Sequence, residues 1–462
     1  MNGALQAASR IRYLALASLV VLIAPLGSCG GGSGGGSEIS TFSKSYGGPA
    51  DDAANAIAAT ADGGYVLVGQ TGFERLLLNG VEGGELWLNK LDANGNVESA
   101  RRIGLPANEL PGTTTTRYAR GRPTADGGFV LVGEAKFFDD RNGDGLLNTD
   151  EHLNTTDIAV TKLRSDGTVE WLRAHDSGDW RNYDYYEANG DKAAAQDVGS
   201  DVWPMDDGGF LVVGDSRANL HDRLGIGFPP GGPAGSDRFH DALSVVAMRL
   251  NADGSLRWTR RLADDFFVAD NPYYLAATGP IIRGTSDGGA VLSRGLRVDD
   301  PDNDDTSDPG NSVTAVWRLG ADGAPFWMRA LDDPSFATDV EQTDDDADGA
   351  RDDGFVLTAD DPNFEAYIVK LSADGDVHWQ AEIGDNFADL PDEVALGDVK
   401  QSCGALGGAC VLRAVGSYEE DGVPQRAVVQ VLDEQGSEIE RVVAPLPLTF
   451  ISRIGDAARG AP

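Results

Sequence analysis

A hairpin string that recurs along the chain restricts what this sequence can fold into. It is an Asp-Gly-Gly turn followed by an alternating apolar run, and its first occurrence is T-A-D-G-G-Y-V-L-V-G, Thr60–Gly69. The further copies, of which the last two are weaker, begin at Thr124, Met205, Thr285, Arg351 and Gly407. Because Gly adopts positive φ at little cost, Asp-Gly pairs favour the tight turns of β-hairpins. A hairpin repeated in this way predicts a repeat architecture built from β-strands.

A second signature follows each hairpin. It is an apolar strand, in most copies a basic residue and a Leu, and then an Asn/Asp-Gly turn, with copies beginning at Leu86, Ile158, Val245, Val313, Tyr367 and Val428. Four residues after the turn Gly stand Trp171, Trp258, Trp327 and Trp379, with Ser99 and Glu440 in that place in the first and last copies. The unit therefore reads as four strands, exemplified by Ala53–Thr60, Tyr65–Gly69, Leu86–Leu91 and Glu170–His175.

Four antiparallel strands, repeated six times, are typical of the blades of a β-propeller. We therefore expect an all-β protein with one propeller of six four-stranded blades, seven blades being the alternative. A parallel β-helix would repeat every 20–25 residues or roughly so. Two segments read as a fourth strand for the last blade, Ile39–Gly48 with Phe42 in the Trp place and Ser437–Ala444. We expect ring closure near the N-terminal strand, and a tail over residues 445–462.

The N-terminus has the pattern of a targeting segment. Arg10 and Arg12 precede the apolar run Tyr13–Pro25, which is too short for a membrane-spanning helix. The following L-G-S-C, Leu26–Cys29, resembles the lipobox of bacterial lipoproteins, in which the Cys is lipidated. The resemblance implies a signal peptide over residues 1–28, a lipidated Cys29 with a Gly/Ser tether over 29–38, and a propeller over 39–444. An ordinary signal peptide with a chance Cys is the alternative.

The address of the mature protein follows from the same resemblance. Gly30, rather than Asp, follows the Cys, which implies export to the bacterial outer membrane, on its periplasmic side or at the cell surface. Such an address allows disulfides, and the two other cysteines bracket the turn of the sixth hairpin. We expect Cys403 and Cys410 to form a cross-hairpin disulfide, with two free thiols as the alternative. Their spacing is not C-x-x-C, so a redox or zinc role is not expected.

The charge balance limits the partners. The chain has 74 acidic and 37 basic residues and a net charge of −37. This argues against nucleic acid and anionic lipid headgroups as partners, and leaves the lipid anchor as the expected membrane contact. Cations or cationic peptides suit the charge, although a solvated acidic surface explains most of it. We expect a monomer.

One insertion carries a metal-binding motif. Residues Asp140–Glu151 match D-x-[DN]-x-[DN]-G-x5-E and resemble an EF-hand calcium loop. The resemblance implies Ca²⁺ bound by Asp140, Asn142, Asp144, the carbonyl of Leu146, Asn148 and Glu151. A strand rather than a helix enters the loop, so we expect calcium to stabilise the insertion rather than to act as a signal; a hydrated acidic loop is the alternative. A partial second motif, without the closing Glu, comprises Asp344, Asp346, Asp348 and Asp352.

Loop lengths distinguish the two faces of the expected propeller. The turns between strands one and two and between strands three and four share one face and are short, whereas the long insertions fall on the opposite face. We call these the short-turn face and the long-loop face, and expect ligand binding at the latter. Its aromatic residues suit sugars or cationic peptides, unless they only pin the loops to the scaffold. They are Trp180, Tyr183, Tyr185, Tyr186, Phe266, Phe267, Tyr273 and Tyr274.

The repeats resemble those of bacterial lipoproteins and secreted proteins built from D-G-G-[YF]-x-L-x-G and K-L-x-x-D-G-x-x-x-W units, over Ile39–Ala444. The Gly four residues before a Trp is also similar to quinoprotein-type propellers, but the vicinal Cys pair of quinone dehydrogenases is absent. No catalytic residue stands out. We expect a binding or scaffold protein with an unknown protein or carbohydrate ligand. The alternatives are a propeller hydrolase or lyase acting on glycans, and, by resemblance to a propeller lipoprotein, a scaffold of outer-membrane protein assembly.

Overall fold

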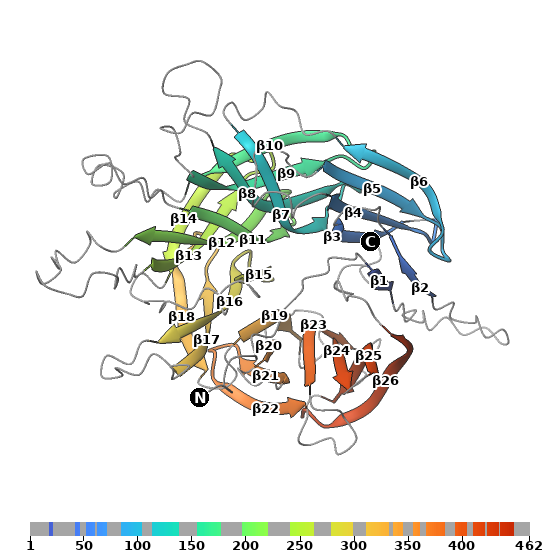
Figure 1. The fold of residues 1–462 in the computed structure, drawn as a ribbon. Helices are drawn as coiled ribbons and strands as arrows, with labels where there is room; N and C mark the ends of the chain where they lie inside the picture. Colours follow the sequence, from blue (N-terminus) through green and yellow to red (C-terminus); the bar gives the residue numbers. More distant parts are fainter. Residues whose placement is uncertain are drawn as a thin grey trace, which may run out of the picture.

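In the computed structural model, the repeated segments of the sequence form β-strands. The structure describes residues 18–21, 42–46, 52–60, 62–71, 85–103, 113–137, 155–176, 196–219, 241–262, 279–298, 311–331, 336–344, 354–360, 366–383, 393–403, 410–420, 423–433 and 435–447. Within these ranges every regular element is a β-strand (Figure 1). No helix in the described part is long and apolar enough to cross a membrane.

Strands β3 to β26 form six blades of four consecutive antiparallel strands. The first two blades hold β3 (Asp52–Ala59), β4 (Tyr65–Thr71), β5 (Glu85–Leu91) and β6 (Val97–Ile103), then β7 (Thr113–Pro123), β8 (Phe129–Phe137), β9 (Thr155–Leu163) and β10 (Val169–His175). The third and fourth hold β11 (Gln196–Pro204), β12 (Phe210–Asn219), β13 (Asp241–Leu250) and β14 (Leu256–Leu262), then β15 (Ile281–Gly284), β16 (Ala290–Val298), β17 (Asn311–Leu319) and β18 (Pro325–Leu331). The last two hold β19 (Phe336–Thr343), β20 (Gly354–Asp360), β21 (Ala366–Ser372) and β22 (Val377–Ile383), then β23 (Glu393–Cys403), β24 (Cys410–Glu420), β25 (Val423–Leu432) and β26 (Glu438–Pro447).

The blades follow one another around a common centre, as the colour sequence from blue to red in Figure 1 shows. The first strand of each blade is innermost, and contacts run from β3 to β7, β11, β15, β19 and β23 in turn. A single parallel bridge, Gln196 to Thr156, joins the second and third blades. The expected all-β propeller with six four-stranded blades is confirmed.

The apolar core lies between neighbouring blades. Leu211 and Val245 of the third blade share one cluster with Leu292 and Trp317 of the fourth. Equivalent clusters join the fourth blade to the fifth and the fifth to the sixth. Because both faces of a blade are covered, its middle strands are apolar along their length rather than strictly alternating.

The short turns explain why the Asp-Gly-Gly and Lys-Leu signatures recur together. In the first blade Thr60 N donates to Gly64 O and Gly63 N donates to Thr60 O, both at 2.9 Å. Gly63 has φ of 81°, and a Cβ on Gly64 would collide with the carbonyl of Leu91. The turn Asp binds the basic residue of the same blade, with pairs Lys90–Asp62 at 2.7 Å, Lys162–Asp126 at 2.7 Å and Arg318–Asp287 at 2.6 Å.

The tryptophans of the outer strands contact a turn of the next blade. Trp258 Nε1 donates to the carbonyl of Ala321 at 3.0 Å, and its ring covers Gly323, where a Cβ would come within 2.9 Å. Arg260, two residues further, donates to the carbonyl of Asp322 at 2.8 Å. The same Trp bond is made by Trp171 to Ala252 at 3.1 Å and by Trp327 to Ala373 at 3.0 Å. We call this contact the Trp–Gly clamp; the sequence indicated its Trp and Gly but missed its Arg.

The last blade corrects one detail of the expected ring closure. Its fourth strand is β26, which extends past the expected boundary at residue 444, so the prediction that the N-terminal strand completes this blade is wrong. β26 follows β25 through a turn in which Asp433 N donates to Ser437 O at 2.9 Å, and such a local hairpin closes a much shorter loop than pairing with the distant N-terminus.

The N-terminal strand instead lies beside the first blade. β2 (Phe42–Ser45) pairs with β1 (Ser18–Val21), which falls inside the expected signal peptide. Tyr46, directly after β2, is buried in the cluster of the first blade and its hydroxyl donates to the carbonyl of Gly95 at 2.7 Å. If the lipobox is processed as expected, β1 is removed and Tyr46 remains the contact of this segment with the blade.

Candidate functional site

Charged side chains gather where the inner strands meet. Four of these strands carry a charged residue directly after a β-bulge, and on three of the four the residue two positions further along is charged as well. The set, which we call the central tier, has four bases and four acids, namely Arg120, Arg122, Arg283, Lys400, Asp201, Asp339, Glu341 and Asp398. Trp203 occupies the equivalent place in β11, opposite Leu211.

Asp201 and Arg283 hold the middle of the central tier. The Asp201 carboxylate is completely buried and accepts from Arg283 Nη1 at 2.8 Å and from the backbone amides of Val202 at 3.0 Å and Ile282 at 3.3 Å. Arg122 lies 3.4 Å from the same carboxylate. Arg283 reaches Asp339 with its other terminal nitrogen. Charges on the inner strand of one blade are thus neutralised by residues of the neighbouring blades.

Opposite charges also join the fifth and sixth blades. Lys400 Nζ lies 2.5 Å from a carboxylate oxygen of Glu341. Burial alone would lower the pKa of Lys400, but Glu341, Asp398 and Asp339 together raise it, so the ammonium keeps its proton. Burial lowers the pKa of Arg120, partly offset by Asp201.

The indole ring of Trp203, which lies beside the central tier, is surrounded by cationic side chains. The guanidinium carbons of Arg122 and Arg283 lie 4.9 and 5.1 Å from the ring centre of Trp203, and Lys400 Nζ lies 5.9 Å from it. Trp203 is 8% exposed, and these cation–π contacts cover its ring. In the central tier the carboxylates of Asp201, Asp339 and Glu341 are each paired with a cationic side chain of a neighbouring blade.

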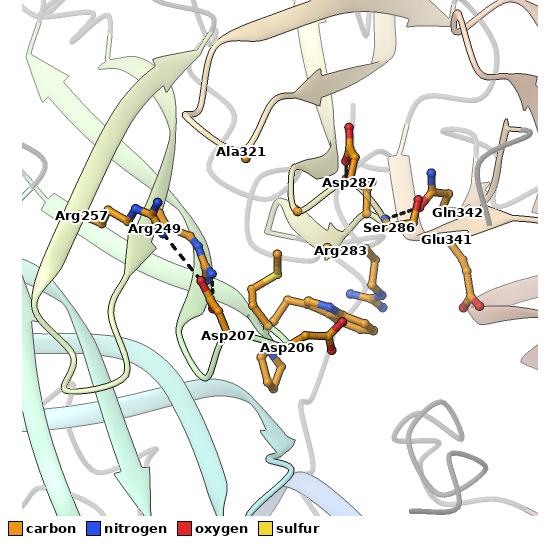
Figure 2. A pocket seen from close by; sticks show the side chains of 16 residues that line it. Asp206, Asp207, Arg249, Arg257, Arg283, Ser286, Asp287, Ala321, Glu341 and Gln342 are labelled. Carbon is orange, nitrogen blue, oxygen red and sulfur yellow. Dashed lines mark hydrogen bonds and ion pairs between the residues drawn. The ribbon is translucent and has the colours of Figure 1, made fainter. Parts of the chain in front are cut away.

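A cavity of about 730 Å³ lies against the central tier, between the third and fourth blades. Its rim is formed by residues of two Asp-Gly-Gly turns, Met205–Asp207 and Thr285–Gly288, so it opens on the short-turn face. Figure 2 shows Arg249, Arg257 and Asp207 on one wall and Ser286, Asp287 and Gln342 on the other. Trp203, Arg283 and Glu341 line it from the centre. This volume is in the range of small-molecule sites, about 300–1,000 Å³.

The polar contacts of the cavity walls are well defined. Arg249 lies 2.5 Å and Arg257 3.6 Å from the carboxylate of Asp207. The side-chain oxygen of Gln342 accepts from the amide of Ser286 at 2.8 Å. Arg249 binds Asp207 and lowers the pKa of that carboxyl, with help from the amide of Gly209, so the carboxylate stays ionised near neutral pH. The sequence did not indicate this cavity, because its loop lengths favoured the long-loop face as the binding surface.

The predicted calcium loop and the aromatic loop residues lie outside the described part of the chain, as does Cys29. Of the second acidic motif the structure describes Asp344, which is buried at the end of β19 with its amide donating to Gln401 at 2.7 Å. Asp346, Asp348 and Asp352 lie outside the described ranges. Within those ranges no three His, Cys, Asp or Glu side chains come together to hold a metal ion.

The two cysteines of the sixth hairpin stand at its open end. Cys403, the last residue of β23, is the direct cross-strand partner of Cys410, the first residue of β24. Directly opposed cysteines can be joined across an antiparallel pair. The register is therefore compatible with the expected bond, which stays a prediction.

Comparison with known proteins gives no family for this chain. No family model and no curated protein matches it. Among solved structures, the periplasmic gluconolactonase PpgL of Pseudomonas aeruginosa is similar with 13% identity and a TM-score of 0.39, covering 88% of this chain and 91% of that one. The Dos1 propeller has 9% identity and a TM-score of 0.37, covering 84% of both chains. The hemagglutinin-neuraminidase ectodomain of parainfluenza virus 5 has 8% identity and a TM-score of 0.36, covering 83% and 80%.

These similarities are too loose to carry an argument about what the protein binds or does. The propeller architecture rests on the six blades of the chain itself, and function has to be argued from its own residues.

Proposed function

We propose that the protein is a lipid-anchored, extracytoplasmic β-propeller that binds a protein or carbohydrate partner through its long-loop face. The observation that carries this proposal is the distribution of connection lengths. Strands one and two, and three and four, are mostly joined by turns such as Thr60–Gly64, closed by reciprocal backbone bonds. The second and third strands of a blade are joined by long segments, for example Phe137 to Thr155 and Asn219 to Asp241.

The central tier supports a binding rather than a catalytic role. Its carboxylates Asp201, Asp339 and Glu341 each have a cationic partner from a neighbouring blade. Glycosidases need one carboxyl free to donate a proton and a second to act as nucleophile or base. The residues at the centre therefore favour binding over the alternative of a glycan hydrolase or lyase. A scaffold role in outer-membrane protein assembly is one form that such binding takes.

Anchoring and calcium complete the proposal. The L-G-S-C of Leu26–Cys29 and the Gly/Ser tether after it would leave the propeller free to turn its loops toward a partner. Asp140–Glu151 has oxygen ligands at the spacing of a calcium loop. A calcium ion bound there would fix the conformation of most of the insertion between β8 and β9.

The strand register shows how to test the long-loop face without harming the blades. Asn219 and Asp241 are direct cross-strand partners, and so are Phe137 with Thr155 and Val298 with Asn311. Each intervening insertion can therefore be replaced by an Asn-Gly turn, which suits a two-residue hairpin. The experiment captures crosslinked partners from intact outer membranes with calcium present, using the full-length protein and each shortened variant.

We expect the shortened proteins to stay folded, with a single cooperative melting transition, while losing the crosslinked partner. As the matched control, an equal number of Gly/Ser residues replaces the insertion, which keeps its length but removes its side chains. Retention of the same partner by all three shortened variants would exclude the long-loop face as the binding surface.

A further inference from the structure

The repeats provide an internal standard for the residues around the cavity at the short-turn face. In the first, second and fourth blades a Thr precedes the Asp-Gly-Gly turn by two residues and its hydroxyl donates to the turn Asp, as Thr124 does to Asp126 at 2.5 Å and Thr285 to Asp287 at 2.7 Å. The third blade has Met205 in this place. The next residue is Ala or Ser in those blades but Asp206 in the third.

A third departure lies on the facing hairpin of the same blade. Directly before the Trp place, the first two blades have Glu98 and Glu170, which pair with Lys90 at 2.9 Å and Lys162 at 3.8 Å. The third blade has Arg257 there, beside Arg249, and both arginines share the single carboxylate of Asp207. Met205, Asp206 and Arg257 all line the cavity. The last three blades have Phe326, His378 and Ile439 in the place of Arg257, so building a blade does not fix this position and it is free to serve a ligand.

The floor of the cavity adds a buried donor. Arg283 is 2% exposed, and its terminal nitrogens are held by Asp201 and Asp339. Its Nε has no hydrogen-bond acceptor among the described residues. Leaving a buried N–H without an acceptor is costly, so a small side-chain shift that opens it to the cavity would let a ligand oxygen accept from it.

These groups define a ligand chemistry. Arg257, with more than half of its side chain exposed, and the Arg283 Nε–H suit an oxyanion, and guanidinium groups bind carboxylates well. Asp206 offers an exposed acceptor for a hydroxyl group, and Met205 an adaptable apolar contact. We propose that the cavity between the third and fourth blades binds a small hydroxylated carboxylate, such as a sugar acid. This second site lies on the face opposite the long loops and is independent of the partner binding proposed above.

The test is calorimetric titration of the full-length mature protein at about 0.15 M salt, where the field of its many distant acidic groups is screened. The probes are D-galacturonate, D-glucuronate and L-tartrate, each compared with its neutral counterpart, D-galactose, D-glucose or L-threitol. The variant is Arg257→Glu, which restores the residue of the first two blades and so preserves the blade. The control is Arg164→Glu, an equal change of charge on an exposed turn of the second blade.

We expect at least one of the acids to bind saturably, and its neutral counterpart at least about tenfold more weakly. Arg257→Glu is expected to weaken that binding by at least about tenfold, while Arg164→Glu leaves it unchanged. Three results would overturn the proposal: no binding of any acid, equal binding by the wild type and Arg257→Glu, or an equal loss in Arg164→Glu. Matching melting temperatures of the two variants confirm that both are folded.

Discussion

At the scale of single residues, the chain contrasts charges that hold the ring together with charges that decorate it. Asp201 is fully buried and contacts arginines of two neighbouring blades, whereas Asp62 pairs with Lys90 at the surface, where its side chain is 56% exposed. Removing one partner of a buried ion pair leaves an uncompensated charge, while exposed pairs contribute little.

We therefore expect Asp201→Asn to lower the free energy of unfolding by about 3–5 kcal/mol. Asp62→Asn, the matched exposed control, should leave it nearly unchanged. Urea denaturation of the two variants measures the difference. Equal effects would show that the central tier does not hold the blades together.

Asp157, near the start of β9, predicts a pH dependence of stability. Burial, with Asp176 and Asp197 nearby, raises the pKa of Asp157 to about 6. Since its folded pKa lies above its unfolded value of about 4, the folded state binds this proton more tightly. The stability that the protonated form contributes is present below about pH 4 and is lost as pH rises to about 6.

The neutral variant Asp157→Asn should consequently be more stable than the wild type at pH 7, on the order of 1–3 kcal/mol, and the gap should close at pH 4. Melting curves of both proteins at the two pH values, in EDTA, provide the measurement. A gap of the same size at pH 4 would mean that the ionisation of Asp157 is not its cause.

At the scale of elements, the Trp–Gly clamp is the contact that joins one outer strand to the next. Gly323 and Gly63 both have positive φ, 79° and 81°, so Ala is disfavoured by the backbone at either position. Only at Gly323 would the added Cβ meet a neighbour closely, at 2.9 Å from Trp258, while the space around Gly63 is open within 4 Å.

Gly63→Ala is expected to cost about 1 kcal/mol through its backbone alone. Gly323→Ala should cost roughly 1–3 kcal/mol more, because Trp258 must leave its place on the turn. Differential scanning calorimetry of both variants isolates the clamp. Equal losses at the two glycines would mean that the clamp adds nothing to the stability of the ring.

Much at this scale follows from the sequence. The blade hairpins and the Trp place are local features, set by Asp-Gly turns and by the spacing from Gly167 to Trp171 and its repeats, so reading along the chain finds them. The sequence does not show which segment forms the fourth strand of the last blade, because two segments have similar patterns. Only the three-dimensional structure shows that β26, and not β2, pairs with β25. The cavity needs Arg257, Met205 and Arg283, from two blades, to be seen together, although departures from the repeat could have indicated the first two.

At the scale of the whole molecule, a rigid ring carries insertions that the repeats do not explain. Calcium is expected to stabilise the insertion between β8 and β9 through the loop ending at Glu151. EDTA should therefore lower the melting temperature of the wild type by several degrees, as a loss of 1–2 kcal/mol in a large domain would. In Glu151→Gln the difference between calcium and EDTA should vanish. A wild-type melting temperature that does not respond to EDTA would contradict calcium binding.

The most direct test of the proposed function compares the two faces in living cells. A photo-crosslinking amino acid is placed in turn at Phe228, in the insertion between β12 and β13, and at Asn94, in a short turn of the first blade. Illumination of intact cells followed by immunoblotting shows whether a partner is attached. We expect a discrete adduct from residue 228 and none from residue 94; an adduct from residue 94 alone would contradict binding through the long-loop face.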